Sequence, residues 1–134
     1  RAVYSWLGGG TGKKQDLLRS AHDVSEGGLL VAIAEGLFAM GLGANIELSS
    51  EDDPWRFGFG EGFHNFVVTA REIDTSALEQ EWKSLDIPFQ SLGETQSNGI
   101  LKVKWQDAAS NQNKSFEIPT AELYRAWLKE GYWE

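Results

Sequence analysis

Residues 21–28, which read AHDVSEGG, hold the densest group of chemically active side chains in the sequence. Paired glycines let backbone N–H groups approach an anion closely, and carboxylates are preferred ligands of Mg²⁺. Two carboxylates alone would repel a phosphate, whereas a hard cation between them reverses that sign. The stretch is therefore a candidate site for a magnesium–phosphate complex, with Asp23 as the candidate metal ligand. The candidate ligand-binding residues in it are His22, Asp23, Ser25, Gly27 and Gly28.

The apolar run at 29–40, LLVAIAEGLFAM, has to position this stretch. It is rich in helix formers, apolar on nearly every face and charged only at Glu35, so we expect a buried helix. Ser25 is the predicted N-cap, and Gly41 and Gly43 are the predicted stop. Residues 17–22 have the length of a strand. The predicted unit is a strand, a polar turn and a buried helix, a junction at which α/β proteins bind ligands.

Each candidate residue also has a purely structural interpretation. Asp23 and Glu26 would be favourable beside a helix N-terminus whatever else they do. His22 could hydrogen-bond a substrate, orient Asp23 or pack in the turn. Ser25 is favoured as a cap over a nucleophile, because no nucleophile-elbow motif surrounds it. For the two acids, the sequence leaves the functional and structural interpretations equally open.

Two further stretches of the sequence are rich in glycine, and one of them is a candidate for anion binding. Residues 55–63, WRFGFGEGF, are predicted to form a loop anchored by Phe57, Phe59 and Phe63. Glu61 in this loop is a further candidate ligand-binding residue, the alternative being a tight turn into a strand at 64–70. The run GGGTGKK at 8–14 lacks the first glycine and the final Ser or Thr of a phosphate loop, so it is predicted to be a surface loop.

The remaining pattern predicts a mixed sheet covered by helices, in the α+β or α/β/α class. Alternation of apolar and polar residues predicts a half-buried strand at 44–48 and a hairpin of 99–105 with 115–118. Helices are predicted at 75–85 and from 119 onward. The apolar sides of these helices would be Ala77, Leu78, Trp82 and Leu85 in the first, and Leu123, Trp127 and Leu128 in the second. A short strand at 88–92 and a turn at 93–99 complete the prediction.

Length and composition limit the number of domains and the classes of partner that the chain can have. A chain of 134 residues is long enough for one domain rather than two. A net charge of −8 argues against nucleic acid as a partner, because binding phosphate backbones requires clustered Lys and Arg. The absence of cysteine excludes disulfides and suits a cytoplasmic protein, and no apolar run reaches transmembrane length. Because the sequence begins RAVYSW, without Met, we expect a piece of a longer polypeptide.

Several stretches, from about Leu17 onward, carry a family resemblance. These are AHDVSEGGLLVAIAEGLFAMGLGANIEL, FGFGEGFHNFVVTA, SLGE with GILKVKW, and IPTAELYRAWL. They resemble the C-terminal half-domain of the aminoimidazole-ribonucleotide-synthetase-related superfamily, and within it the phosphoribosylformylglycinamidine synthases. Glu26 stands where that family usually has Asp. Residues 63–65, Phe-His-Asn, replace its usual Pro-Gly-Arg, so a role of that Arg cannot be carried over.

The resemblance implies a fold of three α/β/α layers and a part in an ATP-dependent ligase of purine biosynthesis. In that family, ATP activates the amide oxygen of formylglycinamide ribonucleotide, and ammonia from glutamine displaces phosphate to give the amidine. ATP, Mg²⁺ and the catalytic His are held mainly by a preceding N-terminal half-domain, and a glutaminase is a further domain or subunit. Residues 1–134 would then be one half-domain that forms one wall of a cleft for a small-molecule substrate, with no catalytic residue and no activity alone.

Two alternatives remain from the sequence. One is a half-domain of another ATP-dependent member of the superfamily, of the selenophosphate synthetase or thiamine-monophosphate kinase type. The other is a non-catalytic dimerisation or scaffold module, for which Trp6, Tyr132 and Trp133 would suit an interface.

Overall fold

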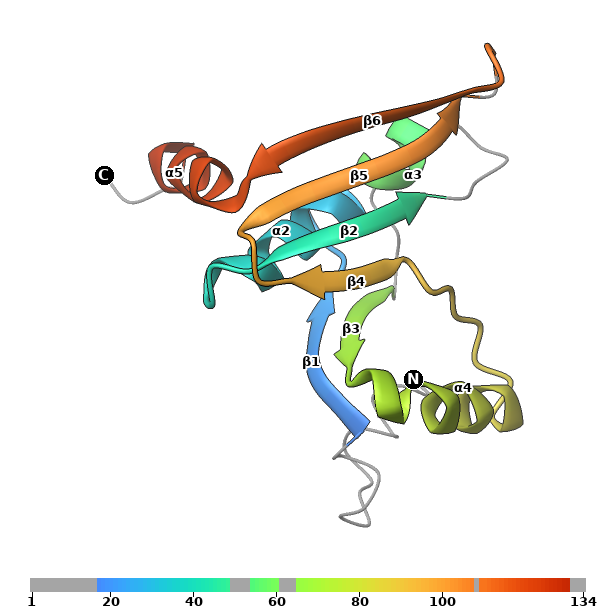
Figure 1. The fold of residues 1–134 in the computed structure, drawn as a ribbon. Helices are drawn as coiled ribbons and strands as arrows, with labels where there is room; N and C mark the ends of the chain where they lie inside the picture. Colours follow the sequence, from blue (N-terminus) through green and yellow to red (C-terminus); the bar gives the residue numbers. More distant parts are fainter. Residues whose placement is uncertain (1–16, 49–53, 61–64, 108, 131–134) are drawn as a thin grey trace. The chain divides into compact units, whose positions relative to one another are not determined.

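The computed structural model describes residues 17–48, 54–60, 65–107 and 109–130 (Figure 1). It confirms the α+β class. Of the described helices, none combines the length and apolar character needed to cross a membrane. The elements follow in the order β1 Leu18–Asp23, α2 Gly28–Phe38, β2 Gly43–Leu48, α3 Pro54–Phe59, β3 Phe66–Ala70, η2 Glu72–Asp74, α4 Thr75–Ser84, β4 Gly93–Gln96, β5 Ile100–Asp107, β6 Gln112–Pro119 and α5 Thr120–Glu130.

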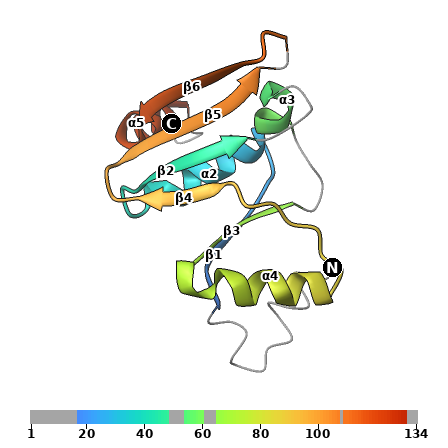
Figure 2. The same cartoon turned by 45° about the vertical axis from the view of Figure 1, so that its right-hand side comes forward.

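The larger sheet is mixed, as predicted. Its strands lie in the order β4–β2–β5–β6, and β2 runs parallel to β5 and antiparallel to β4 (Figure 2). Strands β5 and β6 form the predicted hairpin, with Ile100 opposite Pro119 and Asp107 opposite Gln112. Strands β1 and β3 pair in a separate two-stranded sheet.

The chain divides into two compact units. The described part of the first comprises residues 17–21 and 68–91, and that of the second comprises 22–48, 54–60, 65–67, 92–107 and 109–130. In the first unit, the Ser20 and Thr69 hydroxyl oxygens lie 2.6 Å apart. The helix predicted at 75–85 is present as α4, where Leu78 is buried but Leu85, just beyond the helix end, is 47% exposed. The described candidate site residues lie in the second unit.

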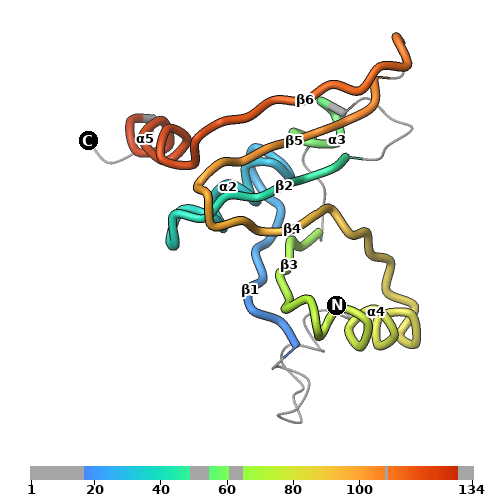
Figure 3. Tube along the Cα trace, in the orientation of Figure 1, coloured from blue at the N-terminus to red at the C-terminus, as the bar shows by residue number. Residues whose placement is uncertain are grey.

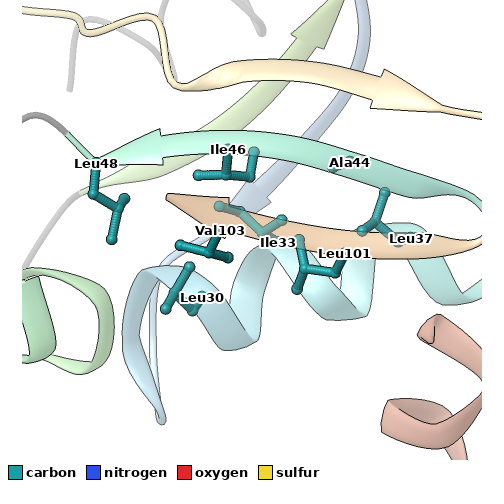
Figure 4. Close-up of a cluster of buried hydrophobic side chains, with 8 residues drawn as sticks. All are labelled: Leu30, Ile33, Leu37, Ala44, Ile46, Leu48, Leu101 and Val103. Atoms are coloured by element: carbon teal, nitrogen blue, oxygen red, sulfur yellow. The ribbon is translucent and has the colours of Figure 1, made fainter. Parts of the chain in front are cut away.

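The core of the second unit lies between α2 and the sheet (Figure 4). Alternate residues of β2 and β5 point to α2, so that Asn45 and Glu47 on β2 are exposed while their neighbours are buried. The Cα trace shows α2 lying along the sheet (Figure 3). This confirms the buried helix and the half-buried strand. The buried cluster is Leu30, Ile33, Leu37, Ala44, Ile46, Leu48, Leu101 and Val103.

The ends of α2 and α5 are fixed by backbone carbonyls and glycine. Gly41 has φ +61° and donates its N–H to the Phe38 carbonyl, while Leu42 donates to Leu37. This pair of bonds is typical of a helix stop with a left-handed glycine, as predicted for Gly41. Gly43, the other predicted stop, is the first residue of β2. At the predicted start of the last helix, the buried Thr120 hydroxyl donates to the Leu42 carbonyl at 2.7 Å.

The predicted loop at 55–63 was wrong for its first half, because residues 54–59 form α3. Proline is tolerated in the first turn of a helix, where its missing N–H costs nothing. Gly58 lies close to the core, since a Cβ there would be 2.7 Å from Leu30 Cδ1 and the leucine would have to shift. Phe57 packs against the core as predicted, whereas Phe59 is 46% exposed and stacks on Trp55. Phe63 lies outside the described residues.

The short strand predicted at 88–92 was also wrong, because the strand is β4, inside the predicted turn. Its residues are polar, and sheet pairing holds them through the backbone: Gly93 lies opposite Ile46, and the Glu47 N–H donates to the Leu92 carbonyl at 2.7 Å. A Cβ on residue 93 would lie 1.8 Å from the Asn45 carbonyl oxygen. Glycine is therefore required for this pairing.

The apolar side predicted for the last helix is only partly buried. Leu123 packs against the core, whereas Trp127 and Leu128 are 44% and 48% exposed. Trp127 packs against Phe38 of α2 with the two rings tilted by 55°, and Tyr124 stacks on Trp127. The helix thus contacts α2 through aromatic rings that stay half in solvent.

Candidate functional site

The predicted junction between strand and helix is present. Strand β1 ends at Asp23, and the next residue, Val24, is buried and donates its N–H to the Asn65 carbonyl at 2.8 Å. The turn then passes through Gly27 and Gly28 into α2. Asp23, Ser25 and Glu26 are all exposed in this turn.

Ser25 is not the N-cap, so that prediction was wrong. The cap is Gly27, in the left-handed conformation and without a side-chain hydrogen bond. Ser25 contributes its carbonyl instead, which accepts the Gly28 N–H at 3.2 Å. The left-handed turn takes the hydroxyl away from the capping position, and the first turn of α2 contains no acid. The positive end of the helix dipole is therefore left without a compensating capping side chain.

Both glycines of the turn are required by backbone geometry. Gly27 and Gly28 have φ values of +81° and +77°, a region that residues with a Cβ rarely adopt. A Cβ on residue 28 would also lie 2.6 Å from the carbonyl carbon of Phe59 at the end of α3. One on residue 27 would lie 2.7 Å from Val31 Cγ2. The structure thus gives both residues a structural reason that is independent of any ligand.

His22 is held at both ring nitrogens. Its Nδ1 lies 2.7 Å from the Asp23 carbonyl oxygen, and its Nε2 lies 3.1 Å from Glu35 Oε2. The other oxygen of that carboxylate accepts the Trp127 Nε1–H at 3.2 Å. We call this arrangement the His22–Glu35–Trp127 chain. It joins the end of β1 to α2 and α5.

Sequence reasoning missed the partners of Glu35. It noted this residue only as the single charge of an apolar helix. A partly buried charge needs hydrogen-bond partners, so a lone Glu in such a helix could have been assigned one in advance. The partners themselves come from residues 13 and 92 positions away, and no local pattern identifies them.

Asp23 is an exposed carboxylate beside this chain of contacts. Its side chain is 67% exposed, and its Oδ1 lies 3.9 Å from His22 Nδ1. Glu61, the other candidate acid, lies outside the described residues, as do His64, the glycine run at 8–14 and the residues Trp6, Tyr132 and Trp133. Among the described residues, His22 contacts the Asp23 carbonyl and the Glu35 carboxylate.

The described side chains of the junction do not form a complete metal site. Within the described ranges, no three His, Asp or Glu side chains lie close enough together to hold a metal ion. Mg²⁺ is commonly bound through one or two protein carboxylates together with water and substrate phosphates. Asp23 fits the role of a single contributed ligand, with the remaining ligands coming from outside the described part of the chain.

A separate groove of about 350 Å³ lies on the polar face of the larger sheet. None of the candidate residues at the junction lines it. Lys102 and Glu117 form an ion pair across its floor between neighbouring strands. The side chains that line it include Asn45, Glu47, Asn98, Lys102, Lys104 and Glu117.

Together, the mixed sheet, the buried helix and the glycine turn at its start define an α+β domain with a candidate ligand site at the helix N-terminus. The chain belongs to the family of AIR synthase related proteins: the model of that family's C-terminal domain matches residues 11–106.

Relatives and solved structures agree with this assignment. The chain is 36% identical over 116 residues to the phosphoribosylformylglycinamidine synthase subunit PurL of Azorhizobium caulinodans, covering 86% of this chain and 15% of the relative. It is 32% identical over 120 residues to the same subunit of Erythrobacter litoralis, covering 84% and 15%. The chain therefore spans about one seventh of the length of these relatives.

The fold is also that of a solved relative. Phosphoribosylformylglycinamidine synthase II of Thermotoga maritima matches with a TM-score of 0.69 at 19% identity, covering 82% of this chain and 19% of that one. Structures of Thermotoga maritima PurL with FGAR and with ADP match with TM-scores of 0.67, at 21% and 20% identity, and cover 82% of this chain and 18% and 19% of those. At this identity the likeness shows the fold.

Proposed function

We propose that residues 1–134 form one C-terminal half-domain of a phosphoribosylformylglycinamidine synthase. The observation that carries the proposal is the 36% identity to a PurL subunit across 86% of this chain. The alternatives within the superfamily, selenophosphate synthetase and thiamine-monophosphate kinase, are not favoured, because relatives that match most of this chain are PurL subunits. The proposed enzyme converts formylglycinamide ribonucleotide, ATP and ammonia to the amidine, ADP and phosphate.

In this proposal, the junction at the start of α2 lines one wall of the substrate cleft. The uncapped helix end supplies a positive dipole toward phosphate, and the exposed Asp23 carboxylate supplies one ligand toward Mg²⁺. The ion would neutralise charge on the transferring phosphoryl group when bound. Ser25, Gly27 and Gly28 remain proposed phosphate neighbours, and so does Glu61. ATP binding is supported by the nucleotide complexes of Thermotoga maritima PurL, which has this fold.

The partners follow from the size of the chain. Because it spans about one seventh of its relatives, the proposal requires an N-terminal half-domain that holds most of the nucleotide site and the catalytic groups. It also requires a glutaminase domain or subunit that supplies ammonia. A cytoplasmic location belongs to the same proposal.

The test is a chimera. The matching segment of the Erythrobacter litoralis PurL subunit is replaced by this chain, and ATP-dependent formation of the amidine is measured with the other components of that enzyme. The parent subunit and a parent lacking the segment are the controls. We expect turnover by the chimera and none without the segment. A folded chimera that forms no amidine would contradict the proposal.

A further inference from the structure

The His22–Glu35–Trp127 chain ends on the main chain of Asp23. Both ring nitrogens of His22 are engaged, one with the Asp23 carbonyl and the other with Glu35. A histidine has only these two polar atoms, and because both partners here are acceptors, the two contacts are hydrogen bonds together when each nitrogen carries a proton. His22 therefore presents no unoccupied nitrogen to a ligand, and its contacts are directed at the backbone of the next residue.

Glu35 is suited to hold the ring still. Its side chain is 31% exposed, so its hydrogen bonds are formed in surroundings less polar than water and are correspondingly stronger. The terminal torsion of a histidine has a broad minimum, so the ring orientation is set by its partners rather than by its own preference. Each carboxylate oxygen has one donor partner, which fixes Glu35 in turn.

Trp127 adds the third element to this arrangement. It donates to Glu35 from α5, and its ring packs on Phe38, one helical turn after Glu35. The indole is thereby anchored on α2 at two points. Its N–H does not reach His22 and acts on that ring only through the carboxylate.

We propose that Glu35 and Trp127 are positioning residues that act through His22 on Asp23. His22 then fixes the backbone carbonyl of Asp23, the residue whose exposed side-chain carboxylate is the proposed ligand, and it does not bind substrate. The inference rests on the proposed function for its role in the reaction, and on the three contacts for its structural part.

The structural part is tested by NMR on the 134-residue chain, without nucleotide. The sequence has only two histidines, so the His64 ring signals serve as an internal reference for those of His22. Trp127→Phe removes the indole N–H and keeps an aromatic ring. We expect it to shift the His22 ring signals and to leave those of His64 in place. Tyr124→Phe, on the same helix and in the same ring stack, is the matched control and should shift neither.

The Glu35→Ala variant tests whether the Trp127 indole acts on His22 through the Glu35 carboxylate. In Glu35→Ala, the carboxylate that links the two rings is absent, and Trp127→Phe should no longer move the His22 signals. Unchanged His22 signals in Trp127→Phe would overturn the inference. Equal shifts with and without Glu35 would also overturn it, because the indole would then act by another route.

The role in the reaction is tested in the chimera. Trp127→Phe should lower kcat/KM about threefold, the scale of one lost hydrogen bond, and should have no further effect in a His22→Ala background. Independent, additive losses would overturn the positioning role. An inactive chimera would contradict the proposed function while leaving the NMR result to decide the structural part.

Discussion

Gly28 at the start of α2 lies directly against the backbone of Phe59 at the end of α3, so that a Cβ on residue 28 would be 2.6 Å from the Phe59 carbonyl carbon. Only glycine permits this approach at a φ of +77°. The contact ties the turn that carries the candidate site to the glycine-rich stretch predicted as a second candidate. A substitution of Gly28 therefore tests how the turn is packed, independently of any ligand.

Gly28→Ala should destabilise the chain by about 2 kcal/mol or more, from the left-handed backbone and the clash together. The measurement is the urea midpoint of unfolding. Gly36→Ala is the control on the same helix, because a Cβ there meets nothing within 4 Å. It should stabilise the helix by about 0.5–1 kcal/mol. Equal midpoints for the two variants would contradict the contact.

Ile33→Ala should cost about 2–5 kcal/mol, because it opens a cavity between α2 and the sheet. Ile33 belongs to the buried cluster, whereas Ile73 is 83% exposed. Ile73→Ala therefore provides the matched control and should change the free energy of unfolding by less than about 0.5 kcal/mol. A chemical-denaturation midpoint unchanged in Ile33→Ala would show that α2 is not the hydrophobic centre.

Asp23→Asn in the chimera should lower nucleotide-dependent turnover strongly and leave the melting temperature within a few degrees, the shift expected for under about 1 kcal/mol. The carboxylate is exposed and does not cap α2, so its loss removes an anionic ligand with little structural cost. Asp86→Asn removes a charge from another exposed Asp and should leave turnover unchanged. Activity of Asp23→Asn within twofold of the parent chimera would return Asp23 to a structural role.

The pKa of Asp107 is lowered from 3.8 to about 2, first by its hydrogen bond with Lys114 and then by those from the Ser110 hydroxyl and the Ala109 N–H. Because the folded value lies below the unfolded one, this carboxylate stabilises the fold above about pH 3.8, and the contribution is lost as the pH falls toward 2. Unfolding midpoints measured across this range should fall less steeply in Asp107→Asn. Parallel curves for the two proteins would contradict the assignment.

The purified 134-residue chain should form no amidine from formylglycinamide ribonucleotide, ATP and ammonia. It spans about one seventh of its PurL relatives, and the proposed catalytic groups lie on the N-terminal half-domain. Product analysis with the chimera as the positive control checks this. ATP-dependent product from the chain alone would require a complete site within these residues.

Hydrophobic periodicity predicted the parts of the fold that alternate or bury a continuous face. Helix α2, strand β2 and the β5–β6 hairpin follow from it, since each places apolar residues on the face toward the core. Strand β4 has no such face: Gly93 to Gln96 is polar, and its conformation is set by backbone pairing with β2. Glycines at 58 and 60 predicted a loop, whereas Gly58 lies within helix α3 and close to Leu30.

The position of the candidate site in the chain was predictable from the sequence, but the contacts of its side chains were not. The types and order of residues 22–28 predicted a turn before a buried helix, and that turn is present. The left-handed Gly27 displaced Ser25 from the capping role, and such a local backbone choice is invisible in a pattern of polar and apolar residues. The contacts of Glu35 depend on α5, which enters only through the folded structure.

The parallel pairing of β2 with β5 has a consequence for synthesis of the chain. Ala44 lies beside Leu101 and Ile46 beside Val103, although more than fifty residues separate them in sequence. A nascent polypeptide that has not reached Val103 cannot close the cluster around α2, so Leu30, Ile33 and Leu37 lack two of their partners until then. Non-local pairing of this kind slows folding and leaves apolar surface open to aggregation in the meantime. The helix that carries the candidate junction is thus synthesised before the strands that bury it.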